Sequence, residues 1–248
     1  MFRHYLSFFV VVVFAVSCST TNQPTSILYK DYPIDTKETK VDSGLVKMLQ
    51  PYTISLNASM DKVIGFTNNT LSAKQPESGL GNLMADCMKT MAEKKFNRKI
   101  DAGFMNQFGI RTSIPKGNIT VGKIFELMPF DNLVVLQEIK GTVFKQFLER
   151  IASAGGWPVS AGVKMSIRDK KLVDVTINGK LLDENSTYVI ANSDYVAGGG
   201  DNCEMLRNIP QISKGYLFRD ALLEFVSNFT QQGKPIDYTI ENRVVNVN

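Results

Sequence analysis

From about Val41 to its end, the 248-residue sequence alternates between two kinds of hydrophobic pattern. Apolar residues recur every three or four positions from Leu80 to Met91, behind Ser78 as a candidate N-cap, which predicts an amphipathic helix. Short β-rich runs at 163–169, 171–179 and 186–195 predict strands. Because helices interleave with strands that are partly joined as hairpins, we expect one α/β domain of the α+β kind, a mixed sheet with flanking helices.

The remaining elements follow from the same patterns. Asp42 and Ser43 offer an N-cap to a further helix that contains Pro51. Other predicted helices cover 142–152 and 217–229, and other predicted strands cover 62–67, 70–74, 100–106, 133–140 and 242–247.

The N-terminal segment reads as a leader. Residues 1–17 place Arg3 before an apolar run that is too short to span a membrane, and Cys18 follows at once. This arrangement resembles a bacterial lipoprotein signal, in which the cysteine becomes the lipidated first residue; ordinary secretory cleavage is the alternative. We expect a signal peptide at 1–17, a lipidated tether at 18–41 and the folded domain at 42–248. The expected location is therefore the bacterial cell envelope, with a lipid anchor to the membrane and a periplasmic or surface-facing domain.

Charge and cysteine content limit the partners and the cysteine chemistry that we expect of this protein. The formal net charge is +4, and removal of the leader takes away one basic residue. Since the basic residues are scattered, apart from a cluster at 94–99 that reads as a solvated helix end, we expect no nucleic-acid partner. Cys87 and Cys203 remain in the domain, either as a disulfide or as buried thiols.

The predicted domain contains no histidine, and this absence excludes several kinds of catalytic and metal site. The single histidine, His4, lies in the leader, which excludes catalysis by Ser-His-Asp or Cys-His groups and any metal site with histidine ligands in the domain. We therefore expect no catalytic residue, metal or cofactor in this chain. Four acids lie near turns with no spacing typical of an acid/base pair, and we expect solvated loop acids: Asp101, Asp131, Asp194 and Asp201.

Five residues in three segments suit ligand binding. Asn106 ends a predicted strand, and Arg111 follows Gly109, where a planar guanidinium could meet phosphate or carboxylate. Phe130 follows a proline, and Tyr195 stands beside a run of three glycines with Asp201 after it. The plainer alternatives are a surface arginine and a core phenylalanine. Together the five indicate a pocket for a flat base on a polar sugar.

Five motifs in order carry a resemblance to a known family. They are GLGNLMADCM, DAGFMNQFGIRTSIPKGNIT, ELMPFDNLVV, EIKGTVFKQFLE and NSDYVAGGGD. The segment 41–248 resembles the C-terminal domain of the 5′-nucleotidases, nucleotide hydrolases of the periplasm and cell surface. The resemblance implies that the base stacks between Phe130 and Tyr195, where phenylalanine is usual. It also implies that Asn106 and Asp201 contact base and ribose, and that Arg111 serves the phosphate or ribose side.

The sequence differs from the usual family pattern in ways that affect the function we expect. The N-terminal metallophosphoesterase domain, which holds two metals, is not in this sequence. Pro76 stands where an arginine usually precedes the GNL helix, and Gly198 replaces a polar residue. We therefore expect a lipid-anchored protein that supplies nucleoside or nucleotide binding to a metallophosphoesterase polypeptide, which would carry the divalent metals. The rivals are a binding lipoprotein without catalysis and a structural lipoprotein without ligand.

Overall fold

A computed structural model describes residue 26, residues 28–30 and residues 41–247. Chain contacts divide it into two units, 1–48 and 49–248. The predicted leader and Cys18 lie outside the described residues, so the expected domain boundaries remain predictions. Within the described residues, no helix is long and apolar enough to cross a membrane.

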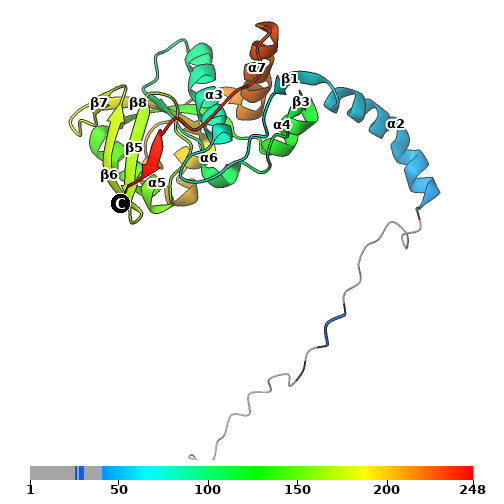
Figure 1. The fold of residues 1–248 in the computed structure, drawn as a ribbon, viewed down its shortest axis with the longest axis horizontal. Helices are drawn as coiled ribbons and strands as arrows, with labels where there is room; N and C mark the ends of the chain where they lie inside the picture. Colours follow the sequence, from blue (N-terminus) through cyan, green and yellow to red (C-terminus); the bar gives the residue numbers. More distant parts are fainter. Residues whose placement is uncertain (1–25, 27, 31–40, 248) are drawn as a thin grey trace, which may run out of the picture. The chain divides into compact units, whose positions relative to one another are not determined.

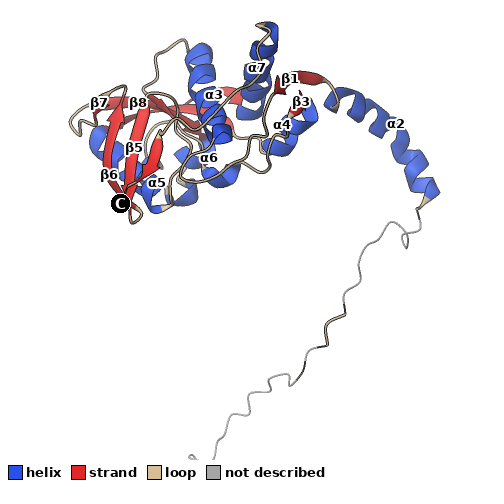
Figure 2. Cartoon of the chain, viewed as in Figure 1, coloured by secondary structure: helices blue, strands red, loops and turns tan. Residues whose placement is uncertain are grey.

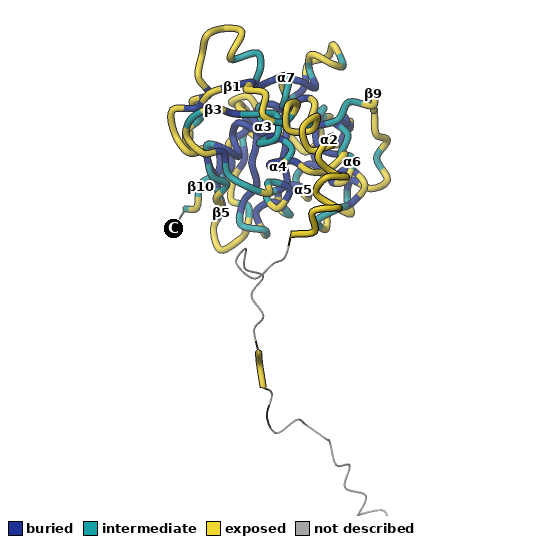
Figure 3. Tube along the Cα trace, turned by 90° about the vertical axis from the view of Figure 1, so that its right-hand side faces the viewer, coloured by how far each residue is buried: buried dark blue, intermediate teal, exposed yellow. Residues whose placement is uncertain are grey.

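The helix predicted after Asp42 is α2 (Ser43–Met60), and it continues through Pro51. Asp42 caps it, since its Oδ1 accepts hydrogen bonds from the backbone N–H groups of Gly44 and Leu45. No residue of α2 is buried, as Figure 3 shows by its yellow colour.

The second unit is built on a four-stranded mixed sheet in the order β2-β8-β4-β9. Its strands are β2 (Ala102–Gly103), β4 (Leu133–Lys140), β8 (Thr187–Ser193) and β9 (Ile212–Leu217). β8 runs parallel to β2 and antiparallel to β4, which in turn pairs antiparallel with β9. The mixed sheet confirms the expected fold class.

A second four-stranded sheet has the order β10-β5-β6-β7. It consists of β5 (Val163–Arg168), β6 (Lys171–Ile177), β7 (Lys180–Leu181) and β10 (Val244–Asn246). A two-stranded sheet joins β1 (Val63–Thr67) to β3 (Gly117–Thr120). In Figure 1 this small sheet lies at the opposite end of the unit from β5, β6 and β7.

Helices pack on these sheets. They are α3 (Gly79–Phe96), α4 (Val121–Leu127), α5 (Gly141–Ser153), the single turn α6 (Asp194–Ala197) and α7 (Phe218–Gln231), with short 3-10 turns η1 (Gln107–Gly109), η2 (Gly200–Asn202) and η3 (Glu204–Leu206). Figure 2 shows helices and strands interleaved along the chain. The predicted N-cap is confirmed, because Ser78 Oγ accepts a hydrogen bond from the backbone N–H of Gly81.

Two separate cores lie on the two faces of the central sheet. Leu136 of β4 and Ala191 of β8 join a core with α3, α4 and α7, whereas Ile139 and Ile190 join a core with α5 and the second sheet. Successive strand residues point to opposite faces, so one strand serves both cores. Cys87 is buried in the first core and Cys203 in the second, and both are free thiols, which decides between the two alternatives left open by the sequence.

Two local predictions were wrong, and one strand was missed. Residues 70–74 form no strand, since only Leu71 makes a single bridge to Ile114. The strand predicted at 100–106 is reduced to Ala102–Gly103. β9 was not predicted at all, because its residues are exposed or only partly buried and show no alternation of apolar and polar side chains.

Candidate nucleoside-binding cavity

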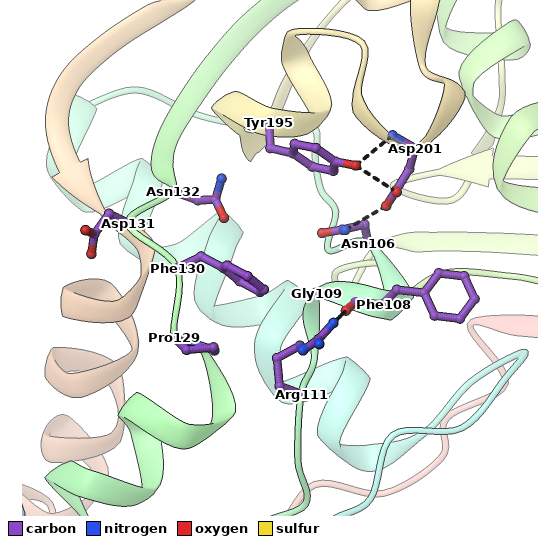
Figure 4. A pocket seen from close by; sticks show the side chains of 10 residues that line it. All are labelled: Asn106, Phe108, Gly109, Arg111, Pro129, Phe130, Asp131, Asn132, Tyr195 and Asp201. Carbon is purple, nitrogen blue, oxygen red and sulfur yellow. Dashed lines mark hydrogen bonds between the residues drawn. The ribbon is translucent and has the colours of Figure 1, made fainter.

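A cavity of about 680 Å³ brings the five predicted residues together from three distant segments. Its lining consists of Asn106, Phe108, Gly109, Arg111, Pro129, Phe130, Asp131, Asn132, Tyr195 and Asp201. Figure 4 shows Phe130 and Tyr195 on opposite sides of an open space. The volume lies within the range of about 300–1,000 Å³ that is usual for small-molecule sites.

Tyr195 lies in the helical turn α6 and not at the end of the strand predicted at 186–195. β8 ends at Ser193, whose side chain caps α6 by accepting a hydrogen bond from the backbone N–H of Val196 at 3.3 Å. Tyr195 is 48% exposed and lines the cavity, so part of its side chain is accessible to a ligand.

The glycine run wraps the chain around the Tyr195 ring. Gly199 has φ of 95° and Asp201 has φ of 52°, both in the left-handed region, which turns the chain back toward the ring. Arg150 of α5 fixes this turn from outside, since its Nε donates to the backbone oxygen of Asp201 at 2.8 Å. Asp is among the non-glycine residues that adopt this backbone region most readily.

Asp201 is the polar centre of one wall. Its Oδ1 accepts a hydrogen bond from the Tyr195 hydroxyl at 3.1 Å, and its Oδ2 accepts one from Asn106 Nδ2 at 2.7 Å. The bond to Asp201, together with burial, raises the pKa of Tyr195. The Tyr195 hydroxyl therefore remains protonated at neutral pH and donates to the carboxylate.

Phe130 is placed by the start of α7. Arg219 Nη1 donates to the backbone oxygen of Phe130 at 3.2 Å, and Nη2 pairs with Asp131 Oδ1 at 2.6 Å. The Arg219 guanidinium carbon lies 4.4 Å from the centre of the Phe125 ring. Phe130 is 38% exposed, so it is not the core phenylalanine of the plainer reading.

Arg111 stands at the rim of the cavity. Its side chain is exposed, its guanidinium carbon lies 5.7 Å from the centre of the Phe130 ring, and Nη1 donates to the backbone oxygen of Phe108 at 3.3 Å. In Figure 4 the Phe130 ring lies between Tyr195 and Arg111. The cation can support the Phe130 ring and keeps further N–H groups for an anion.

The expectation of solvated loop acids was wrong for three of the four. Asp101 Oδ2 accepts from the backbone N–H of Val189, and Asp194 Oδ1 accepts from Asn132 Nδ2 and from two backbone N–H groups. Asp201 is held as described above, and Asp131 is the exposed one. The loop carboxylates thus serve as acceptors for backbone N–H groups, two of which are partly buried.

Sequence reasoning missed Asn132, Phe108 and Arg219. Asn132 follows Phe130 by two residues in the same turn, a polar position that could have been noted. Arg219 lies 88 residues from Asp131, and no sequence pattern joins the two. Within the described residues, no three side chains of His, Cys, Asp or Glu are grouped so that they could hold a metal ion.

Comparison with known proteins adds an independent finding. The sequence model of the family described as 5′-nucleotidase, C-terminal domain, matches residues 61–208. The 5′-nucleotidase of Vibrio cholerae is 28% identical over 214 residues, and Protein UshA of Escherichia coli is 26% identical over 215 residues. These alignments cover 82% and 83% of this chain, but only 36% and 37% of those proteins.

A solved structure agrees with this match. The crystal structure of the 5′-nucleotidase precursor from Thermus thermophilus has a TM-score of 0.71 with this chain at 26% identity, covering 84% of this chain and 44% of that one. The chain therefore spans less than half the length of the proteins that it matches.

Proposed function

The chain belongs to the 5′-nucleotidase C-terminal domain family, and from this premise we propose that it is the nucleoside- and nucleotide-binding half of a 5′-nucleotidase-type phosphoesterase. A metallophosphoesterase on a separate polypeptide would supply the divalent metals and the hydrolytic chemistry. The two chains together would take part in nucleotide breakdown outside the cytoplasm.

One observation carries the binding half of the proposal. Phe130 and Tyr195, 65 positions apart in sequence, face one cavity and do not pack against each other, with Asn106, Asp201 and Arg111 around them. Two exposed rings with a space between them can stack on both faces of a base, and each such stack contributes about 1–3 kcal/mol.

The polar groups fit the rest of a nucleotide. Asp201 can accept a hydrogen bond from a sugar hydroxyl, since each carboxylate oxygen accepts more than one. Arg111 can donate from its planar guanidinium to a phosphate. The base would thus lie between the rings, with the sugar toward Asp201 and the phosphate toward Arg111.

The proposal that binding and hydrolysis lie on two polypeptides rests on the share of its relatives that this chain covers and on its histidine content. The chain corresponds to about a third of the length of its relatives, and its single histidine precedes the matched segment. A lipid anchor at Cys18 would keep the pair at the cell envelope, where phosphorylated nucleotides arrive from outside.

Calorimetric titration and reconstitution test the two halves separately. The purified full chain should bind adenosine and adenosine monophosphate and should show no phosphatase turnover with Mg²⁺, Mn²⁺ or Zn²⁺. Addition of a histidine-bearing metallophosphoesterase encoded beside it should produce turnover on nucleoside monophosphates. Metal-dependent turnover by the pure chain alone would overturn the two-chain proposal. Absence of any nucleoside binding at millimolar concentration would overturn the binding proposal in favour of a structural lipoprotein.

A further inference from the structure

Two asparagine amides form part of the cavity wall, and each is bonded to a carboxylate. Asn106 Nδ2 donates to Asp201 Oδ2 at 2.7 Å, and Asn132 Nδ2 donates to Asp194 Oδ1 at 3.1 Å. An ionised carboxylate only accepts hydrogen bonds, so each amide must turn its nitrogen toward its carboxylate. The orientation of both amides is therefore fixed by their partners.

The oxygens of the two amides are consequently turned away from the carboxylates and toward the cavity. In Figure 4 the side-chain oxygens of Asn106 and Asn132 point toward the space between Phe130 and Tyr195. Neither oxygen accepts a hydrogen bond from any described residue. The buried side-chain atoms that lack a partner lie elsewhere in the chain, as at Asn192. Both oxygens can therefore be reached from the cavity and are free to accept from a ligand.

Gly109 keeps one of these oxygens accessible. A Cβ built on Gly109 would come 2.7 Å from Asn106 Oδ1, so any larger residue there would press on the amide. Gly109 also lines the cavity. The missing side chain at Gly109 therefore leaves space beside Asn106 Oδ1 that a larger residue would fill.

The cavity is poor in donors. Among the side chains that line it, the Tyr195 hydroxyl is committed to Asp201, and Arg111 is the remaining cation, at the rim. The acceptors are Asn106 Oδ1, Asn132 Oδ1 and the carboxylates of Asp131 and Asp201. A ligand edge that carries its own donors satisfies such a wall, whereas an edge that carries a carbonyl oxygen places acceptor against acceptor.

We propose that the cavity selects nucleosides whose base carries an amino group at purine C6 or pyrimidine C4, and that Asp201 and Asp194 set this preference by holding Asn106 and Asn132 with their oxygens inward. The inference rests on the proposed nucleoside binding and adds the class of base. Adenine and cytosine present an amino donor at the edge where hypoxanthine and uracil present an oxygen. Asp194 acts through Asn132 and is a positioning residue.

Calorimetric titration of the full chain with matched nucleosides tests the proposal. Adenosine should bind about tenfold more tightly than inosine, the size expected for one hydrogen bond made or lost. Cytidine should likewise bind more tightly than uridine. Purine riboside, which keeps the stacking surface but has neither amino group nor oxygen at that position, should fall between adenosine and inosine.

Variants separate the amide orientation from stacking. Asp201→Asn replaces an acceptor with an amide that can donate to Asn106, so Asn106 can turn its nitrogen inward, and the adenosine-to-inosine ratio should fall to about one or below. Asp194→Asn should reduce the ratio through Asn132. Asp183→Asn is the matched control, since Asp183 lies outside the cavity lining and its carboxylate accepts from the backbone N–H of Asn185 and the hydroxyl of Ser186, so its ratio should equal that of the native chain. The ratio within one variant cancels any change in contacts to the sugar.

The outcomes distinguish the two proposals. If the native chain binds adenosine and inosine equally, or if Asp201→Asn and Asp194→Asn both keep the native ratio, the amino-base selection is wrong and the nucleoside site stands. If the native chain binds no nucleoside, both proposals fail.

Discussion

The ring of Tyr195 lies directly against Gly200, so closely that a Cβ on that glycine would come 2.5 Å from the ring carbon Cζ. The glycine run is thus part of the binding wall. Gly199 turns the chain, and Gly200 leaves room for the aromatic ring. Gly200→Ala should displace the ring and weaken adenosine binding by about tenfold, comparable to the loss of one stacking surface.

Gly198→Ala is the matched control for this substitution. A Cβ at Gly198 would meet the backbone oxygens of Asp194 and Tyr195, at 3.1 and 3.6 Å, and no atom of the ring within 4 Å. Calorimetry on both variants should show the larger loss at Gly200. Equal affinities in the two variants would contradict the role assigned to the Gly200 contact.

The two rings should each contribute to base binding. Phe130→Ala and Tyr195→Ala should each weaken nucleoside affinity about ten- to a hundredfold, because each removes one stacking face. Tyr195→Phe keeps the ring and should cost little. Titration with adenosine checks all three, with circular dichroism to confirm folding. Native affinity in both folded alanine variants would show that the base does not lie between these rings.

The ion pair between Arg243 and Asp86 should stabilise the fold far more than a surface pair. Arg243 donates to both carboxylate oxygens of Asp86 at 2.7 and 2.8 Å, and its side chain is 4% exposed. Arg243→Ala leaves a largely buried carboxylate unpaired and should lower the free energy of unfolding by about 3–5 kcal/mol.

A surface ion pair provides the comparison. Lys94 pairs with Glu224 at 2.5 Å, with both side chains well exposed, so Lys94→Ala should cost at most about 1 kcal/mol. Urea denaturation of the two variants measures the difference. Similar losses of stability in both would contradict a buried structural role for Arg243.

The two domain thiols should be unreactive in the folded protein. Burial raises the pKa of Cys203 to about 12, and burial also raises the pKa of Cys87 well above its usual value. At pH 8 both thiols are protonated, since the pH lies below both raised values, and so neither forms the reactive thiolate. In a Cys18→Ser background, a thiol reagent such as DTNB should label no cysteine in the native chain and two after unfolding. Unfolding without reductant that exposes no thiol would instead indicate a disulfide.

The proposed lipid anchor is tested at Cys18, which lies outside the described residues. Cys18→Ala should release the protein from the membrane fraction, because no acyl chain can then be attached. Membrane fractionation and the mass of the mature chain check this. A variant that remains in the membrane fraction, processed as the native chain is, would exclude lipidation at this position.

Local patterns in the sequence were enough to predict much of this protein. The amphipathic spacing predicted α3, and its N-cap at Ser78 was confirmed. The β-rich runs predicted β5, β6 and β8, because side-chain period and turn residues are properties of neighbouring positions. The five ordered motifs indicated the family, and Asn106, Arg111, Phe130, Tyr195 and Asp201 were predicted as one site from those motifs.

The tertiary structure alone decided the features that depend on long-range contacts. The weakly patterned β9 is a strand because β4 offers it a partner, and Cys87 and Cys203 stay unpaired because they lie in different cores. The contacts of Arg219 with the Phe130 loop and the orientation of the Asn106 and Asn132 amides by Asp201 and Asp194 join residues from 62 to 95 positions apart. A side chain's hydrogen-bond partner depends on which segments of the chain fold together, and the local sequence around either residue does not reveal this.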